Sequence, residues 1–310
     1  MTLKVLEASS ARLIKDGFST KVFDFVSYYA SNILVGNEWD VTAVEVANGE
    51  LVLKALEDSV VAVTGRGRLF VNDREMPLWQ ALPMPKGARL RLVSERECAI
   101  YLGVAGGFMG EDGVAPGATL EYGPSRLTIK ELMEEVPARR IPERVVREEI
   151  YRRELKAVVP NGDAQMTRLL SREKFVLAGK KLGRIAVLKP LNGFFRMVPV
   201  STRDRPRSGS LVVNSGRVLV TYDGLTTEQP VFGMLNAGEL EKISRLKIGE
   251  MVKIRAFSSL KTSVINEYIV LVEKISRCVA GAVEALRRGA KLVRVAANGR
   301  VFEAWVEEIT

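Results

Sequence analysis

The stretch TAVEVANGELVLKALEDSVVAVTG, residues 42–65, decides the fold class of this chain. Its apolar residues alternate with polar ones or form short β-branched groups, which is typical of strands that pack against a core. The Asn-Gly pair at 48–49 interrupts the pattern, as a turn between two strands would. The pattern continues to residue 109, with turn signals at 72–73 and 86–87, and predicts a β-barrel or sandwich half.

Strand signals stop near residue 128 and return after residue 172, so the sequence predicts two β-rich halves. The charged segment between them is interrupted by Pro137 and Pro142 and has a helical pattern, which indicates a helical connection. We therefore predict a mainly β chain with some α-helix, in four segments. These are an N-terminal half (1–128), a helical connection (129–172), a C-terminal half (173–260), and a final helix with a hairpin (261–310).

Two segments outside the strands have apolar residues at helical spacing. Residues 23–34, FDFVSYYASNIL, predict a short helix that ends before Gly36. Residues 263–288 predict an amphipathic helix with Gly289 as its C-cap. The following KLVRVAANGRVFEAWVEEI predicts a hairpin with a type I′ turn at 298–299.

Composition excludes several kinds of chemistry. The 310 residues include no histidine, which removes Ser-His-Asp and Cys-His catalysis and histidine-rich metal sites, and no metal site is predicted. Cys98 and Cys278 are expected to be small buried side chains. No apolar run reaches the ~20 residues that cross a bilayer, so we expect a cytoplasmic protein without a membrane partner.

The formal net charge of +9 favours anionic partners without naming one. The densest basic region, residues 139–153, interleaves arginine with glutamate, which is typical of a salt-bridged solvent-facing surface. Nucleic-acid binding by a basic β-barrel is a lesser alternative, because the basic residues are not interleaved with aromatic ones.

Ordered motifs over residues 17–258 resemble the family of allophanate hydrolase subunit 2, KipA and PxpC, the latter a 5-oxoprolinase subunit. ASNILVGNEWDVTAVEV at 30–46 is a distinctive match. Residues 223–230, DGLTTEQP, resemble the signature Asp-x-Gln-Thr-Thr-Gly-Gly-Tyr-Pro. The resemblance implies two cyclophilin-like β-barrel halves of a carboxyltransferase-like protein.

The departures from the family pattern affect polar and glycine positions. PGATL at 116–120 lacks the arginine of the family's Gly-Ser-Arg-Ser-Thr motif, and Lys181 replaces another family arginine. Glu228 and Gln229 replace two glycines, which removes backbone freedom where a ligand would approach. Apolar core positions are retained, so this chain resembles a divergent member of the family.

The resemblance also implies the candidate site residues. The catalytic candidates are Asp223, Thr226 and Thr227, and the substrate-binding candidates are Asp24, Asn32, Glu45, Lys181 and Arg184. From residue type alone, Asp24 is an N-cap, Asn32 ties down a loop, and Glu45 is either a solvent-facing strand residue or a buried carboxylate with a partner. We predict that Asp223, Thr226 and Thr227 share one cleft with Lys181 or Arg184, where a carboxylate and two hydroxyls lie beside a cation.

Two functions follow from this resemblance. The first is a subunit that acts with a KipI- or PxpB-like partner on a small amide or lactam, as in ATP-dependent opening of 5-oxoproline. ATP would then be bound by the partner, and any biotin would be carried elsewhere, because the chain contains no Met-Lys-Met attachment motif. The alternative is a regulatory or scaffolding module that binds a small amide or carboxylate without turnover, and the departures from the pattern favour it.

Overall fold

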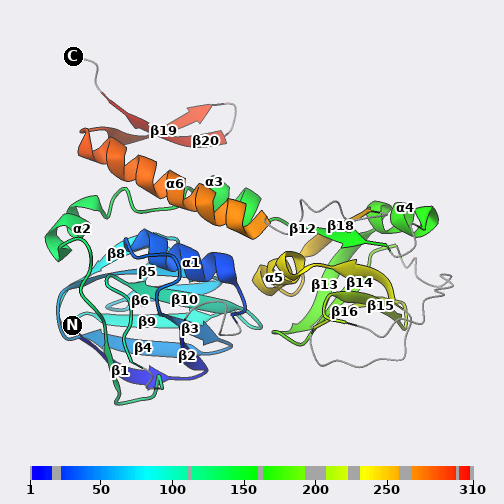
Figure 1. The fold of residues 1–310 in the computed structure, drawn as a ribbon, viewed down its shortest axis with the longest axis horizontal. Coiled ribbons are helices and arrows are strands. Elements are labelled where there is room, and N and C mark those ends of the chain that lie inside the picture. Colours follow the sequence, from blue (N-terminus) through cyan, green and yellow to red (C-terminus); the bar gives the residue numbers. More distant parts are fainter. Residues whose placement is uncertain are drawn as a thin grey trace. The chain divides into compact units, whose positions relative to one another are not determined.

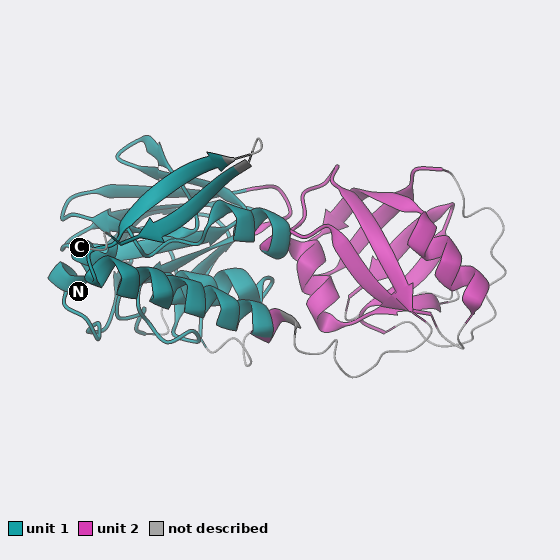
Figure 2. Cartoon of the chain, turned by 90° about the horizontal axis from the view of Figure 1, so that it is seen from above, with its two compact units in different colours: residues 1–94, 100–149, 270–310 teal, residues 95–99, 150–269 magenta. Residues whose placement is uncertain are grey.

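β-Strands make up most of the regular structure of this chain (Figure 1). The computed structural model describes residues 2–15, 22–110, 113–159, 163–192, 207–222, 231–257, 267–297 and 300–307. The chain divides into two compact units (Figure 2). Unit 1 comprises residues 1–94, 100–149 and 270–310, and unit 2 comprises residues 95–99 and 150–269.

Unit 1 contains two sheets whose apolar side chains share one core. The first sheet has the order β11 (Thr119–Glu121), β1 (Thr2–Ala8), β4 (Glu50–Ala55), β9 (Arg89–Ser94), β6 (Gly67–Val71) and β7 (Arg74–Met76). The second has the order β2 (Ala11–Ile14), β3 (Ala43–Ala47), β10 (Ala99–Val104), β5 (Ser59–Gly65) and β8 (Gln80–Met84). Leu51 and Leu53 of β4 join the same apolar cluster as Val61 and Val63 of β5. This spacing of two residues is the alternation seen in the sequence.

Helix α1 (Phe25–Leu34) packs on β5 and β3 of the second sheet. The Asp24 side chain accepts a hydrogen bond from the backbone N–H of Ser27 and so caps the helix. The helix ends at Val35, and Gly36 follows with a φ of 79°, a left-handed conformation that glycine adopts without strain. The predicted helix and both of its boundary signals are therefore confirmed.

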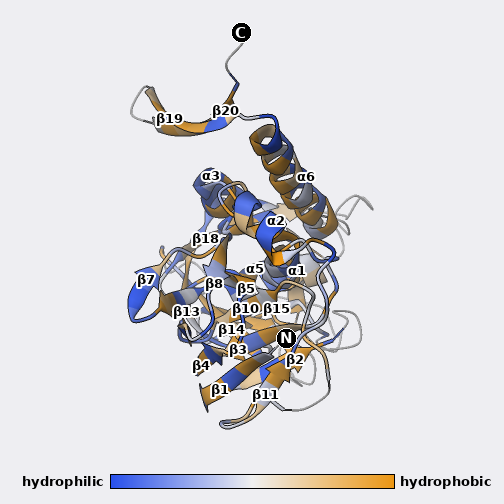
Figure 3. Cartoon of the chain, turned by 90° about the vertical axis from the view of Figure 1, so that its left-hand side faces the viewer, coloured by the Kyte–Doolittle hydropathy of each residue, from blue (hydrophilic) through white to orange (hydrophobic). Residues whose placement is uncertain are grey.

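The remaining helices of unit 1 are α2 (Ile129–Glu135), α3 (Glu143–Val145), a π-helical turn (Val146–Ile150) and most of α6 (Glu267–Arg287). Figure 3 shows α2 as mainly hydrophilic, whereas α6 carries hydrophobic residues along its length. Strands β19 (Lys291–Ala297) and β20 (Arg300–Val306) form the predicted hairpin after α6. Its turn at 298–299 lies outside the described residues.

Unit 2 is built on a closed seven-stranded barrel. Its strand order is β12 (Glu154–Val158), β17 (Val231–Leu235), β15 (Ser210–Asn214), β16 (Arg217–Thr221), β14 (Ile185–Pro190), β13 (Lys174–Lys181) and β18 (Met251–Phe257). A parallel pair between β12 and β18 closes the barrel, and the other described pairs are antiparallel. Helix α4 (Ala164–Arg172) packs on β18, and α5 (Ala237–Arg245) contacts β12 and β17. The interior is filled by residues such as Phe175, Leu188 and Ile254.

The predicted fold class, mainly β with some helix in two β-rich halves, is confirmed. The first half is a pair of sheets and the second a closed barrel. One local prediction is wrong: within the expected helical connection, residues 154–158 form strand β12. The sequence ELKAV alternates, with Leu155 and Ala157 buried, and its pairing partner β18 lies about a hundred residues further along the chain. The units divide between residues 149 and 150, inside that segment, and the final helix and hairpin group with unit 1.

Candidate functional site

The sequence-predicted site residues fall into three groups. Asp24, Asn32 and Glu45 lie in unit 1, around α1. Lys181 and Arg184 lie in unit 2, at the turn between β13 and β14. The catalytic candidates Asp223, Thr226 and Thr227 lie outside the described residues.

Glu45 is a buried carboxylate, with 1% of the residue exposed. On the neighbouring strand β2, Arg12 is its directly opposite residue and forms an ion pair with it, with an Nη2–Oε1 distance of 2.6 Å. The Tyr101 hydroxyl donates to Glu45 Oε2 at 2.7 Å, and the backbone N–H of Phe23 donates to the same oxygen at 3.3 Å. The buried alternative for Glu45 is therefore the correct one.

Burial sets the protonation of this cluster. Loss of solvent raises the pKa of Glu45 above its ordinary value, although the charge of Arg12 and the hydrogen bond from Tyr101 oppose the rise. Burial, followed by the negative charges of Glu45 and Asp24, raises the pKa of Tyr101 well above its ordinary value. Tyr101 therefore stays a phenol and acts as a fixed donor to Glu45. Both Glu45 oxygens are engaged by protein donors, which suits a positioning role at the start of α1.

Asp24 is engaged by the helix that it caps. Its Oδ1 accepts from the Ser27 N–H at 3.1 Å, and its Oδ2 accepts from the Ser27 hydroxyl. Its own N–H donates to the Tyr101 hydroxyl at 2.9 Å. Because 3% of Asp24 is exposed, the geometry supports the capping role that its residue type predicts. Substrate binding by Asp24 stays a prediction.

Two asparagines fix the loop after α1. Asn32 donates from Nδ2 to the carbonyl of Val41 at 2.6 Å, and Asn37 donates to the carbonyl of Val104 at 2.7 Å. The N–H of Gly106 donates to Asn37 Oδ1 at 2.8 Å, so the loop is tied to the end of β10. The loop-fixing role predicted for Asn32 is confirmed.

Lys181 and Arg184 are exposed cations on one turn of unit 2. The Arg184 N–H donates to the Lys181 carbonyl at 2.9 Å, and the Tyr222 N–H donates to the Arg184 carbonyl at 3.2 Å. The Tyr222 hydroxyl donates to the carbonyl of Leu240 at 3.2 Å, and burial raises the pKa of this phenol. Tyr222 is thus fixed beside the turn, and it is the residue that immediately precedes Asp223.

Sequence reasoning missed Arg12 and Tyr101, the two side chains that hold Glu45. A single arginine within the otherwise apolar ARLI and a tyrosine within the apolar CAIYLGV were the available signals. Neither signal identifies Glu45 as the hydrogen-bonding partner, because Arg12 and Glu45 are 33 positions apart in the sequence and Tyr101 and Glu45 are 56 apart.

Among the described residues, no group of three or more His, Cys, Asp or Glu side chains could hold a metal ion. Neither cysteine forms a disulfide; Cys98 is buried and Cys278 is half-buried. Over the same described residues, no helix is both long and apolar enough to cross a membrane.

Comparisons with known proteins agree with this fold. The protein TTHA0988, in two crystal forms, matches with TM-scores of 0.57 and 0.58, at 21% and 22% identity, over 82% of this chain. The urea amidolyase of K. lactis matches over 91% of this chain at 16% identity with a TM-score of 0.57. The urea carboxylase of Kluyveromyces lactis covers the same share at 16% identity with a TM-score of 0.55.

This chain spans only part of each solved relative. It covers 55–56% of TTHA0988, 20% of the urea amidolyase and 29% of the urea carboxylase. No curated protein matches significantly. Residues 22–120 match the family model described as carboxyltransferase domain, subdomain A and B, and this region contains α1, Glu45 and Tyr101. Residues 22–120 are therefore similar to the carboxyltransferase domain, and the chain shares its fold with these solved structures, in agreement with its resemblance to the allophanate hydrolase subunit 2, KipA and PxpC family.

Proposed function

We propose that this chain is the carboxyltransferase-like subunit of a KipI/KipA-type complex and binds a small amide or lactam that carries a carboxylate. One observation carries the proposal: the backbone N–H of Tyr222 donates a hydrogen bond to the carbonyl of Arg184. Tyr222 directly precedes Asp223, so this bond holds the chain next to the Lys181–Arg184 turn just before the signature segment begins. The segment 223–230 carries the family-like signature, and the turn supplies two exposed cations.

The chemistry of these groups suits such a ligand. Lys181 is a point charge and Arg184 a planar donor, and either neutralises a ligand carboxylate. An aspartate and two threonine hydroxyls, at Asp223, Thr226 and Thr227, would accept from and donate to an amide. ATP would be bound by a KipI- or PxpB-like partner.

A binding module without turnover is the second candidate function. The Glu45 cluster of the matched domain favours it, because Arg12, Tyr101 and Phe23 already occupy the carboxylate oxygens. The replacement of two glycines by Glu228 and Gln229 also favours it. Turnover by the complex separates the two functions.

The first experiment titrates the full chain with 5-oxoproline in a calorimeter. Arg184→Gln and Asp223→Ala should each weaken binding by about tenfold or more, since each removes one charged partner. Arg217→Gln is the matched control, because Arg217 is an exposed arginine of the same barrel on β16. Equal affinity in the wild type, Arg184→Gln and Asp223→Ala would reject the site.

The second experiment purifies the chain together with a KipI- or PxpB-like protein and measures 5-oxoproline-dependent ATP hydrolysis. We expect hydrolysis by the complex and none by the chain alone. Binding of 5-oxoproline without hydrolysis by the complex would support the binding module. Robust turnover by the single chain would contradict the requirement for a partner.

A further inference from the structure

A basic concavity lies on the outer surface of unit 2, where strands β12, β18 and β13 run side by side. Its volume is about 420 Å³, within the ~300–1,000 Å³ range of small-ligand pockets. The charged side chains that line it are four cations and one carboxylate: Arg152, Arg153, Lys174, Lys253 and Glu154. All of them belong to unit 2.

The strand register places two lysines directly opposite each other. Lys174 of β13 is the antiparallel partner of Lys253 of β18, and Glu154 of β12 is the parallel partner of Lys253 on the other side. The neighbouring residues Phe175 and Ile254 are buried in the barrel core, so Lys174 and Lys253 point away from it. Like charges directly opposite each other in a sheet are destabilising.

The nearby carboxylates are engaged by the arginines. Arg152 pairs with Glu154 at 2.9 Å, and Arg153 pairs with Glu250 at 3.0 Å. Within the described part of the chain, no carboxylate lies within ion-pair distance of Lys174 or Lys253. Lys174 and Lys253 therefore add two positive charges to the concavity that are not held in an ion pair within the described residues.

We propose that this concavity binds a small phosphate ester. A phosphate monoester carries up to two negative charges, which match the two lysines, and its oxygens accept from several donors at once. Met251, which is 54% exposed and lines the concavity, offers an apolar contact for the carbon part of the ligand. A bound dianion removes the repulsion between Lys174 and Lys253, so ligand binding and barrel stability are coupled.

The test uses glycerol 3-phosphate as the probe. Its affinity is measured by calorimetry and its effect on Tm by thermal unfolding, both at fixed ionic strength. Lys174→Gln and Lys253→Gln should weaken binding about tenfold or more, since each removes one of the two charges. Lys189→Gln is the matched control, because Lys189 is an exposed lysine on β14 of the same barrel and does not line the concavity. It should bind as the wild type does.

Without ligand, Lys174→Gln should have a slightly higher Tm than the wild type, because the substitution removes the repulsion from Lys253, while Lys189→Gln should not. Affinity unaffected by either lysine substitution, or the absence of saturable binding, would overturn the site. Succinate, a dicarboxylate of equal charge, is titrated in parallel. If succinate binds as tightly as glycerol 3-phosphate, the assignment of the site to phosphate esters is wrong.

Discussion

Glu45 illustrates how one buried carboxylate organises its surroundings. Arg12 from β2, Tyr101 from β10 and the backbone before α1 all donate to it. Breaking such a group is costly because the remaining charge is left buried without a partner. The cluster therefore fixes where α1 begins on the second sheet of unit 1.

The raised pKa of Glu45 gives a pH dependence with a definite sign. The folded state holds the proton more tightly than the unfolded chain, whose pKa is near 4.5. The contribution of Glu45 to stability is therefore complete below about pH 4.5 and is lost as the pH rises through its folded pKa. The free energy of unfolding of the wild type, relative to Glu45→Gln, should fall as the pH increases above 4.5.

Glu50→Gln is the control for this prediction, because the pKa of Glu50 is shifted in the opposite direction to that of Glu45. A hydrogen bond from Arg91 lowers the pKa of Glu50, so its contribution is present above about pH 4.5 and is lost as the pH falls through its folded pKa. Urea unfolding of the three proteins between about pH 3 and about pH 8 checks both signs. The prediction is contradicted if the free energy of unfolding of the wild type, relative to that of Glu45→Gln, rises as the pH increases above 4.5.

Gly103 allows α1 to approach β10 closely. A Cβ atom at this position would lie 2.5 Å from the Ser31 carbonyl oxygen, a backbone atom of the helix. Gly103→Ala should therefore lower the free energy of unfolding by about 1–3 kcal/mol through overpacking. Gly281→Ala is the control: a Cβ there meets no atom within 4 Å, and alanine in α6 should stabilise by about 0.5–1 kcal/mol. Equal effects of the two substitutions in urea would disprove the close-packing argument.

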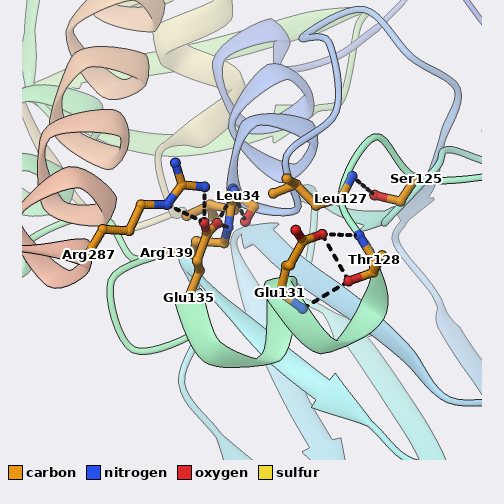
Figure 4. A network of polar contacts seen from close by, with 8 residues as sticks. All are labelled: Leu34, Ser125, Leu127, Thr128, Glu131, Glu135, Arg139 and Arg287. Carbon is orange, nitrogen blue, oxygen red and sulfur yellow. Dashed lines mark hydrogen bonds and ion pairs between the residues drawn. The ribbon is translucent and has the colours of Figure 1, made fainter.

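At the scale of elements, α2 begins with a reciprocal cap. The Thr128 hydroxyl accepts from the Glu131 N–H at 3.2 Å, and Glu131 Oε2 accepts from the Thr128 N–H at 2.7 Å, as Figure 4 shows. Both contacts satisfy N–H groups that a helix leaves without internal partners. This cap places the helix that carries Glu135.

Removing the cap should destabilise the element measurably. Thr128→Ala should lower the free energy of unfolding by about 1 kcal/mol, whereas Thr128→Ser keeps the hydroxyl and should stay close to the wild type. Chemical denaturation followed by circular dichroism measures both. A loss of the same size in Thr128→Ser would assign the effect to the threonine methyl group instead.

At the scale of unit 1, Glu135 joins segments that are distant in sequence. Its carboxylate pairs with Arg139 Nη2 at 2.6 Å and also with Arg287 of α6, while Arg139 Nη1 donates to the Leu34 carbonyl of α1 at 3.4 Å (Figure 4). Glu135 and Arg139 are buried. One carboxylate therefore links α2, the end of α1 and α6.

Glu135→Ala should lower the free energy of unfolding by about 3–5 kcal/mol, because the buried Arg139 loses its counter-charge. Glu284→Ala is the control, since its pair with Arg288 is exposed and should contribute no more than about 1 kcal/mol. Urea unfolding of both variants, monitored by fluorescence, makes the comparison. Similar losses would show that the Glu135 network contributes no more than an exposed ion pair.

The sequence by itself determined the local elements of this protein. Features that depend only on neighbours a few positions away could be predicted. They are the apolar alternation over residues 42–65, the Asp24 cap before α1 and the glycine after α6. Strand β8 contains Pro83, which lowers strand propensity, yet β8 lies at the edge of its sheet, where proline is tolerated.

Only the tertiary structure decided which elements meet. Three of these contacts join residues that are roughly eighty or more positions apart in the sequence. They are the parallel pairing of β12 with β18, the grouping of α6 with unit 1, and the pairing of Lys174 with Lys253 across two strands. Local periodicity shows which face of a strand is buried but carries no information about the strand beside it. For the same reason, the sequence identified Glu45 as a candidate but not Arg12 and Tyr101, whose contacts exist only once the sheet has formed.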